Sequence, residues 1–455
     1  MIPILSSSAM READAKASQS RGVDALVSLA GTAVALCAQR LLDRCYGARV
    51  AVIAGPGLNG RDGRVAARRL RARGAHVNVL EWDHLPQALL GYDLVIDAAF
   101  GLGCSRPFIA PTVGLTTTVL AVDRPSGGDA DSVTCLGAPM LSTATVALGA
   151  LKPSNFIGPS AELEGELFFA GLGIVADFAD GLMDDRDLST LINLKRTDNK
   201  WGYAVQALVG SSLMPGAAEL VLRGALAGGA SMIRLESLGE VATQVALPPE
   251  AVHVTDPTVD PRCRAVVAGP GLGVQAPTWL RERLASAHCP VVLDADGLDR
   301  ALIDDLSPRD GSWVLTPHEG EFARLTGGPL GANRLEDVRA LAAATGCVVL
   351  LKGPTTIIAS PSGTTRVVTS GTPALATAGS GDVLAGLIAG TIARGHAPLE
   401  AAALAAHLHG RAGTRLAPYS GASDLIPKVR DLLIELEQFG RLRNSPRTTT
   451  IVRCR

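Results

Sequence analysis

The residues best suited to catalysis form the run Gly379-Ser380-Gly381-Asp382, at the start of an expected helix. The two glycines allow a tight turn and let the backbone come close to a ligand. Because the first amides of a helix have no partner within it, they can bind an anion. Asp382 adds a carboxylate that can accept a proton from a nearby hydroxyl. The combination favours phosphoryl transfer to an alcohol; the alternative is a strand-to-helix turn in which Asp382 only stabilises the helix start.

Four more motifs in the second half of the chain each follow an expected strand. They are Gly269-Pro270-Gly271-Leu272-Gly273, Asp294-Ala295-Asp296-Gly297, residues 316–322 around His318, and Lys352-Gly353-Pro354-Thr355-Thr356. Lys352 can neutralise phosphate charge, and Gly353 permits a close approach of the backbone. Taken singly, each motif also fits a turn, a strand end, a satisfied histidine or a surface lysine. Their occurrence at successive strand ends favours one shared site.

The first half carries three comparable motifs, at residues 55–63, 97–103 and 123–127. A glycine-rich turn between a strand and a helix suits a phosphate or a dinucleotide. Asp97 and Asp123, with the amide of Asn59 and the hydroxyl of Ser126, could hold a monovalent cation or carry out acid–base chemistry. The same residues also suit turns and helix caps.

The elements that must position these motifs alternate between strands and helices. Expected strands lie at residues 49–54, 77–80, 94–96, 119–122, 205–209, 266–267, 291–293, 313–315 and 348–351. Expected helices lie at residues 65–73, 215–227, 279–287, 335–344, 382–394 and 399–415. The alternation predicts α/β domains with parallel, doubly wound sheets. Ligands of such sheets bind beyond the carboxyl ends of the strands, where the motifs stand.

The length of 455 residues predicts two domains. An acidic stretch at residues 177–187 and a polar one at residues 195–200 indicate the connection. We therefore expect one domain at residues 1–190 and a second at residues 191–440. The final segment, residues 441–455, is basic and rich in Thr, Ser and Pro, so we expect it to be disordered.

Composition narrows the choice of partners and compartment. The net charge of −2 argues against a nucleic-acid partner. The eight cysteines are scattered without metal-ligand spacing, which is typical of buried or free thiols in a reducing compartment. No apolar run approaches the roughly 20 residues of a membrane span. We expect a cytoplasmic protein with no membrane partner.

Residues 196–430 contain these motifs in the order found in the ribokinase-like ADP- or ATP-dependent NAD(P)H-hydrate dehydratases, which they resemble. The resemblance implies a ribokinase-like α/β domain in which a nucleotide, with Mg²⁺, phosphorylates the hydroxyl of hydrated NADH or NADPH (NADHX or NADPHX). Phosphate is then eliminated. By position, Asp382 would be the base and would contact the substrate. The hydrate pocket would include Ala217, Gly271, Gly273 and His318. The nucleotide would be bound by Lys352, Gly353, Pro354, Thr355, Thr356, Gly379, Ser380 and Gly381.

Residues 10–175 resemble the NAD(P)H-hydrate epimerases, a family often fused ahead of the dehydratase. The resemblance implies a Rossmann-like three-layer α/β sandwich that interconverts the two epimers of the hydrate. Asp123 would contact the substrate and transfer the proton. Potassium would be bound by Asn59, Asp97 and Ser126. Further substrate contacts would come from Asn59, Gly60, Asp62, Gly101, Gly103 and Arg106.

The first half departs from its family at four positions. Leu58 and Leu29 each stand where the family has asparagine, Arg61 replaces a glycine, and Arg124 replaces an apolar residue. Leu58 cannot supply the hydrogen bonds of an amide, and Arg61 would strain a backbone with positive φ. These changes leave the epimerase activity open. In the second half Thr372 stands in a turn where the family commonly has asparagine, and we expect activity to survive this change.

The interpretation that joins both halves is a bifunctional repair enzyme for NADHX and NADPHX that uses ADP or ATP and forms a homo-oligomer. Two alternatives stay open. A ribokinase-like kinase for a vitamin precursor would use the same anion site and base, because fold alone does not decide function. A nucleotide-binding scaffold would catalyse neither reaction.

Overall fold

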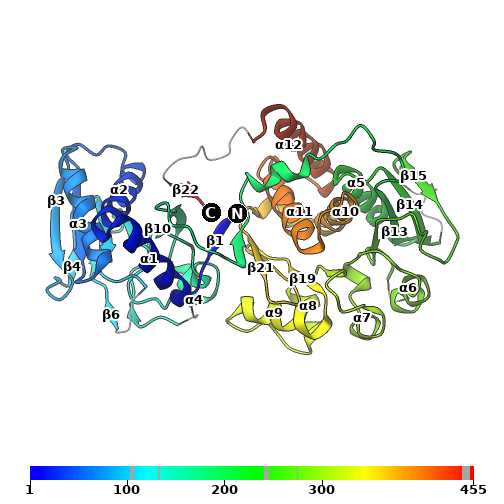
Figure 1. Cartoon of the computed structure of the whole chain (residues 1–455), viewed down its shortest axis with the longest axis horizontal. Coiled ribbons are helices and arrows are strands. Elements are labelled where there is room, and N and C mark those ends of the chain that lie inside the picture. The colour runs from blue at the N-terminus through cyan, green and yellow to red at the C-terminus, as the bar shows by residue number, and fades with distance from the viewer. Residues whose placement is uncertain (103–106, 132–133, 240–244, 274, 443–450, 455) are drawn as a thin grey trace. The chain divides into compact units, whose positions relative to one another are not determined.

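The computed structural model describes residues 1–102, 107–131, 134–239, 245–273, 275–442 and 451–454. The chain forms two compact units (Figure 1). The first unit comprises residues 2–179 and 446–455, and the second comprises Met1 and residues 180–445. The units divide at residue 179, whereas we expected a boundary at residue 190. The difference arises because Asp180–Leu182 forms a strand, β12, that pairs within the second unit.

The first unit is built on a sheet with the strand order β22-β11-β10-β8-β5-β2-β3. Its neighbouring strands are parallel except for the pair β11 and β22. The bounds are β2 Arg49–Ala54, β3 His76–Glu81, β5 Leu94–Ala98, β8 Thr118–Val122, β10 Ala144–Leu148, β11 Glu166–Ala170 and β22 Val452–Arg453. The chain leaves β2 on one side for β3 and returns on the other for β5. The crevice that such a reversal creates is the usual ligand site of these sheets.

Helices cover one face of this sheet and shorter segments cover the other. α2 (Val23–Leu41) and α3 (Leu58–Arg71) share a core with the sheet, to which Val34 and Ile96 belong. Ile53 and Val95 point to the opposite face, where Phe108 packs on them. Short parallel strand pairs lie in the connections, β4 Ala88–Leu89 with β7 Thr112–Val113 and β6 Phe108–Ile109 with β9 Gly137–Ala138. The remaining elements are β1 Ile2–Ile4, α1 Ser7–Arg21, α4 Gly158–Glu162 and the 3-10 turn Pro153–Asn155.

Among the described residues, α2 is the one helix long and apolar enough, by length and composition, to cross a membrane. Its inner residues, including Ala33, Val34 and Cys37, are fully buried in the core of the first unit. A helix buried in this way is apolar because it packs inside the protein. We therefore interpret α2 as a core helix.

The end of the chain completes the edge of the first sheet. β22 pairs antiparallel with β11, and the neighbouring Ile451 is 1% exposed within the core. The expected disorder of residues 441–455 is therefore wrong for residues 451–454, because one apolar side chain and one strand edge hold them in place. Residues 443–450 and 455 lie outside the described residues.

The second unit contains a larger mixed sheet, with the order β12-β21-β20-β19-β18-β17-β16-β13-β14-β15. β20 runs antiparallel to both of its neighbours, and the other pairs in this order are parallel. The bounds are β13 Ala204–Ser211, β14 Met232–Leu238, β15 Ala251–His253, β16 Ala265–Ala268, β17 Val291–Leu293, β18 Val314–Leu315, β19 Val348–Leu351, β20 Thr356–Ala359 and β21 Thr365–Val368. The chain reverses direction across the sheet at β13.

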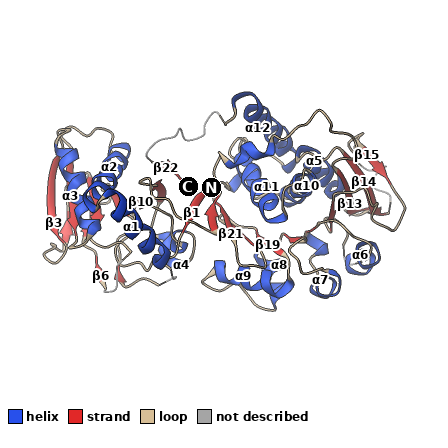
Figure 2. Cartoon of the chain, viewed as in Figure 1, coloured by secondary structure: helices blue, strands red, loops and turns tan. Residues whose placement is uncertain are grey.

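Helices cover both faces of this sheet (Figure 2). One layer contains α5 Pro215–Ala227, α10 Ser380–Ala393, α11 Pro398–Gly413 and α12 Leu425–Phe439. The other layer contains α6 Ala276–Leu284, α7 Arg300–Leu306, α8 Glu319–Thr326 and α9 Arg334–Thr345. Four 3-10 turns lie at Asp187–Leu191, Ala295–Gly297, Pro373–Leu375 and Ala422–Asp424. The fold class expected from the sequence, two α/β domains, is confirmed.

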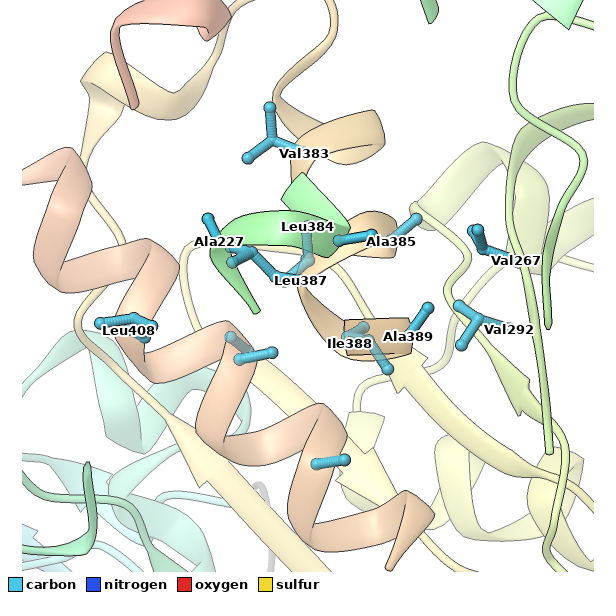
Figure 3. Close-up of a cluster of buried hydrophobic side chains, with 14 of the residues drawn as sticks. Ala227, Val267, Val292, Val383, Leu384, Ala385, Leu387, Ile388, Ala389 and Leu408 are labelled. Carbon is cyan, nitrogen blue, oxygen red and sulfur yellow. The ribbon is translucent and has the colours of Figure 1, made fainter. Parts of the chain in front are cut away.

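The core of the second unit is centred on α10. Figure 3 shows Leu387 and Ile388 of this helix among Ala227 of α5, Val267 of β16 and Val292 of β17. From Val383 to Ala393 every residue of α10 is buried. Such a helix is held on all sides, so the position of its first turn is fixed by the core behind it.

Two sequence-based element assignments differ from the structure in a way that matters for function. α3 begins at Leu58, not at residue 65, so Asn59, Gly60 and Asp62 belong to the first helical turns rather than to a loop. The antiparallel strands β20 and β21 were not predicted. β20 begins at Thr356, the last residue of the Lys352 motif, and so fixes the end of that loop.

Candidate active sites

The predicted phosphoryl-transfer site of the second unit lies at the start of α10. Gly379 precedes the helix in the left-handed conformation, with φ of 87°, and no side chain caps the first amides. The positive φ favours glycine at this position, and an added Cβ would also require the end of the Leu220 side chain, 2.3 Å away, to move. The hydroxyl and the carbonyl of buried Ser380 contact Nε2 of His409, at 3.2 and 3.1 Å. The turn is thus held from behind, and its amides can serve an anion.

The predicted base, Asp382, lies in the first turn of α10, with its carboxyl group largely buried. Burial and then the charge of Asp294 raise the pKa of Asp382 to about 7, while Lys352 lowers it. Burial lowers the pKa of the neighbouring His409 to about 4, so this histidine is neutral. A carboxyl group with a pKa near neutrality can exchange protons at physiological pH, which a general base requires.

Lys352 lies beside the same turn. Its Nζ donates to Oδ1 of Asp294 at 2.7 Å and lies 3.6 Å from Oε2 of Glu321. An added Cβ on Gly381 would lie 3.5 Å from both Lys352 Nζ and Asp294 Oδ2. Burial alone would lower the pKa of Lys352, but the carboxylates of Asp294 and Glu321 outweigh it and raise the pKa. A permanently charged ammonium group therefore faces the helix start.

Three of the residues predicted to line the hydrate pocket, Ala217, Gly271 and Gly273, come together where α5 begins beside the turn after β16. An added Cβ on Gly271 would lie 2.7 Å from Cβ of Ala217, and Gly273 lies next to Met214. The amide of Gly273 donates to Oδ2 of Asp296 at 2.8 Å. Asp296 also acts on the pKa of Asp382, so this group of residues borders the α10 turn.

His318 has a structural role that the sequence did not predict. It is the N-cap of α8, and its Nδ1 accepts from the amides of Gly320 and Glu321 at 3.0 and 3.3 Å. Oε2 of Glu321 in turn accepts from the His318 amide at 2.8 Å, which completes a capping box. Since Glu321 also approaches Lys352, the cap connects His318 to the α10 site.

The Lys352–Thr356 stretch forms a tight loop from β19 into β20. Oγ1 of Thr356 donates to the carbonyl of Gly353 at 3.3 Å. Pro354 is the exposed residue of the loop, and an added Cβ on Gly371 would lie 3.3 Å from the Pro354 carbonyl. The nearby Thr372, where the family has asparagine, caps the 3-10 turn that follows it through its hydroxyl, at 3.5 Å from the Ala374 amide.

The first unit contains a cavity of about 470 Å³ at the reversal between β2 and β5. The predicted residues Asn59, Asp62, Gly101 and Asp123 line it, together with apolar side chains of α1 and α2. Gly60 stands behind the cavity, and an added Cβ there would lie 1.9 Å from the Gly55 carbonyl, so this position demands glycine. Gly103 and Arg106 lie outside the described residues.

Asp123 is held by a buried lysine, Lys152, that lies outside every predicted motif. Lys152 Nζ donates to Oδ1 of Asp123, and the two side chains are 1% and 8% exposed. The amide of Leu148 donates to the same oxygen at 3.3 Å. Asp123 has a positive φ of 67°, which is uncommon for aspartate and marks a constrained position. Lys152 lies beyond the carboxyl end of β10, where site residues of a parallel sheet are expected, and this position could have indicated it from the sequence.

Two of the three predicted potassium ligands form one buried group. Asp97 accepts from the Ser126 hydroxyl at 2.6 Å and from its amide at 2.8 Å, and burial raises the pKa of Asp97. Nδ2 of Asn59 donates to the Val122 carbonyl at 3.1 Å, which leaves its oxygen toward Gly101. The atoms of Asp97, Ser126 and Asn59 that could coordinate a cation are all oxygens, the ligand type that hard cations prefer.

The departures in the first unit have different consequences. Arg61 lies in helical backbone, so it brings no strain, and it pairs with Asp24 at 2.5 Å. Leu58 lines the cavity and makes that part of the wall apolar, whereas Leu29 is exposed. Arg124 is 1% exposed, and none of its guanidinium nitrogens has a hydrogen-bond partner among the described residues.

Comparison with known families agrees with this division of the chain. The model described as NAD(P)H-hydrate dehydratase matches residues 205–434, and the model of the YjeF-related protein N-terminus matches residues 23–89 and 81–154. The chain is also similar to a solved Bacillus subtilis ADP/ATP-dependent NAD(P)H-hydrate dehydratase co-crystallised with ATP and Mg²⁺. That structure is 30% identical, and the match covers 54% of this chain and 95% of the other, with a TM-score of 0.49.

Curated relatives match most of the chain through both units. A bifunctional NAD(P)H-hydrate repair enzyme of Mycobacterium leprae is 35% identical over 83% of this chain and 86% of the relative. One of Moorella thermoacetica is 33% identical over 86% of this chain and 88% of the relative. The chain thus belongs to the family of bifunctional NAD(P)H-hydrate repair enzymes.

Proposed function

We propose that the second unit dehydrates the S epimer of NADHX and NADPHX with ADP or ATP as phosphoryl donor. The observation that carries this proposal is the position of Asp382, a carboxyl group with a pKa of about 7, beside the uncapped amides of α10 and the ammonium group of Lys352. The base and the anion site share the first turn of α10, and the ammonium group lies against this turn at Gly381, an arrangement that suits phosphoryl transfer to a hydroxyl.

The proposed reaction has two steps. Asp382 takes the proton of the hydrate hydroxyl while the hydroxyl oxygen attacks the terminal phosphorus of the nucleotide. The nucleotide, shortened by one phosphate, then leaves. The lone pair of the ring nitrogen then expels phosphate, and loss of a proton from the adjacent ring carbon restores the dihydronicotinamide. Phosphorylation is needed because hydroxide is a poor leaving group and phosphate is a good one.

The nucleotide would occupy the loop from Lys352 to Thr356, with Lys352 neutralising phosphate charge. Mg²⁺ fits this site because the Asp294 carboxylate offers oxygen ligands next to Gly381, and the metal usually binds through one or two carboxylates and the phosphates. When bound, it would neutralise phosphate charge during transfer. The hydrate would lie over Ala217, Gly271 and Gly273, with His318 at its edge.

The test is the recovery of NADH or NADPH absorbance from purified S hydrates, with ATP and ADP offered separately. We expect Asp382→Asn to lower turnover by at least about 100-fold while the protein stays folded and binds nucleotide. Near-normal turnover by this variant would remove Asp382 as the base. Accumulation of a stable phosphorylated product would favour a kinase, and tight nucleotide binding without turnover would favour a scaffold.

We further propose that the first unit interconverts the R and S hydrates in the cavity that Asp123 lines. Potassium, held by Asn59, Asp97 and Ser126, would offset the buried charge of Asp97. Incubation of the full chain with pure R hydrate, without nucleotide, tests the activity by chromatography of the epimers. A rate equal to the spontaneous one would leave this unit a scaffold.

The remaining parts of the proposal concern the setting of the enzyme. We propose a cytoplasmic homo-oligomer with no membrane or nucleic-acid partner. Sedimentation of the purified chain measures the oligomeric state directly.

A further inference from the structure

Three carboxyl groups from three elements line one cavity of the first unit. Asp14 lies on α1, Asp62 on α3 and Asp123 on the turn after β8. Asp14 belongs to no motif considered above, and it precedes residues 23–154, the part that the family model matches. Its position in the cavity is a product of the tertiary fold.

The three groups differ in their partners. Oδ1 of Asp123 accepts from Lys152 and from the Leu148 amide, so this carboxylate is fixed by a buried ammonium group. Such a carboxylate is well placed to orient a substrate. Asp62 is 6% exposed, and its Oδ1 has no hydrogen-bond partner among the described residues. An unpaired, buried carboxyl group aimed at a cavity is suited to a ligand.

The environments of Asp14 and Asp62 give the two carboxyl groups different pKa values. Burial raises the pKa of Asp14 to about 6, and of its charged neighbours Lys152 lowers this pKa while Asp123 raises it. Burial and then the charge of Asp123 raise the pKa of Asp62 to about 8. Arg11 lines the same cavity. At neutral pH Asp14 is mostly ionised and Asp62 is mostly protonated, which is the pattern of a base and an acid.

We infer that Asp14 is a catalytic residue of the first unit, the base that removes the hydroxyl proton of the hydrate during epimerisation. The inference rests on the proposed epimerase function. It assigns proton removal to Asp14 and leaves Asp123, with Lys152, to hold the substrate. Asp62, which lines the same cavity, is the matching proton donor.

The chemistry of the hydrate explains why epimerisation needs both a base and an acid. The hydrated carbon carries a hydroxyl and is bonded to the ring nitrogen, so it is a carbinolamine. Asp14 takes the hydroxyl proton, a C=O bond forms, and the C–N bond breaks with its electrons moving to nitrogen, which takes a proton from Asp62. Rotation presents the other face of the carbonyl, and the reverse steps close the ring as the other epimer. Both protons return, so the enzyme is unchanged.

The test uses the full chain and pure R hydrate without nucleotide, so that the second unit is idle. We expect Asp14→Asn to lower the rate of epimer interconversion by at least about 100-fold, while dehydration of S hydrate with ATP stays at the wild-type rate. The wild-type rate should rise with pH through about 6, and this limb should be absent from the residual activity of Asp14→Asn. Asp14→Glu should restore part of the rate together with the limb.

Glu12→Gln is the matched control, because Glu12 lies on the same helix and pairs at the surface with Lys16. It should leave interconversion unchanged. If the wild-type protein is no faster than the spontaneous reaction, the epimerase function itself is overturned. If the wild type is fast and Asp14→Asn equals it, only the role of Asp14 is overturned. A slow Asp14→Asn variant that keeps the acid limb would make Asp14 a positioning residue and would also overturn the inference.

Discussion

Burial is the main cause of the raised pKa of Asp382, and two charged neighbours adjust that pKa in opposite directions. The charge of Asp294 raises its pKa and the charge of Lys352 lowers it. Because the ionised form is the base, dehydration should rise with pH through about 7. Lys352→Met should move this limb to higher pH and Asp294→Asn should move it to lower pH. The limb is measured from kcat for S hydrate at saturating nucleotide.

Lys195→Met serves as the control for these shifts, because Lys195 is exposed and is not among the groups that act on the pKa of Asp382. It should leave the limb in place. If neither Lys352→Met nor Asp294→Asn moved the limb, the titrating group would not be Asp382.

Arg124 is a buried cation without a hydrogen-bond partner among the described residues. Removing a charge from water is expensive unless a partner compensates it. Arg124→Met keeps the apolar length of the side chain and removes the charge. We expect the free energy of unfolding of the first unit to rise by about 1–4 kcal/mol, measured by urea denaturation. Exposed Arg68→Met should change it by less than about 0.5 kcal/mol. Destabilisation by Arg124→Met would show that the guanidinium group has an anionic partner in solution.

The sequence indicated that the residues of the α10 site would lie together because they follow successive parallel strands, whose carboxyl ends share one edge. Lys352 and Gly381 meet for this reason. The same rule could have indicated Lys152, which follows β10. It could not have indicated Asp14 or His409, because each lies within a helix and reaches its site through tertiary packing alone.

The contact between α5 and α10 depends on glycine. An added Cβ on Gly386 would lie 2.2 Å from the Val221 carbonyl, and one on Gly390 would lie 2.3 Å from the Ala225 carbonyl. Both obstacles are backbone atoms, so a side-chain rotation cannot relieve them. The close approach brings α5, and with it Ala217, against the helix that carries Asp382.

Gly386→Ala sets two effects against each other. Alanine in a helix gains about 1 kcal/mol over glycine, whereas overpacking of a core costs about 1–3 kcal/mol. Since the obstacle is backbone at 2.2 Å, we expect the steric cost to win and the second unit to lose about 1–2 kcal/mol in its free energy of unfolding. Gly328→Ala is the control, because an added Cβ there meets no atom within 4 Å and its φ is not positive. Equal stability of both variants would contradict the role given to Gly386.

The alternation of strands and helices was readable because buried strands such as Arg49–Ala54 are continuous apolar runs. The start of α3 was missed because Asn59, Gly60 and Gly63 are weak helix formers, and tertiary contacts override that preference. α3 packs on α2 at Gly31, where an added Cβ would lie 2.4 Å from Val65. The helix therefore begins where packing, and not propensity, places it.

Each of the two units is built on its own sheet, but the chain crosses between the units more than once. It passes from the first unit to the second at residue 179, and its last residues return to the first. Composition suggested disorder for this tail because most of it is basic and polar. Ile451 and Val452 form a short apolar pair in this polar segment, and the burial of Ile451 could not be inferred from so short a pair.

This return makes the stability of the first unit depend on the end of the chain. Ile451 is 1% exposed in the core of the first unit, and β22 covers the edge of β11, which would otherwise present unpaired backbone groups. Ile451→Ala should lower the free energy of unfolding of the first unit by about 2–5 kcal/mol, seen by calorimetry as a lower temperature for one of two transitions. Arg453→Gln removes only an exposed ion-pair partner of Glu166, so it should change the free energy of unfolding of either unit by no more than about 1 kcal/mol. If Ile451→Ala left both transitions in place, the tail would not be part of the folded first unit. If the variant instead lowered the transition of the first unit and slowed epimer interconversion, while dehydration of S hydrate continued, the tail would be shown to support the epimerase site.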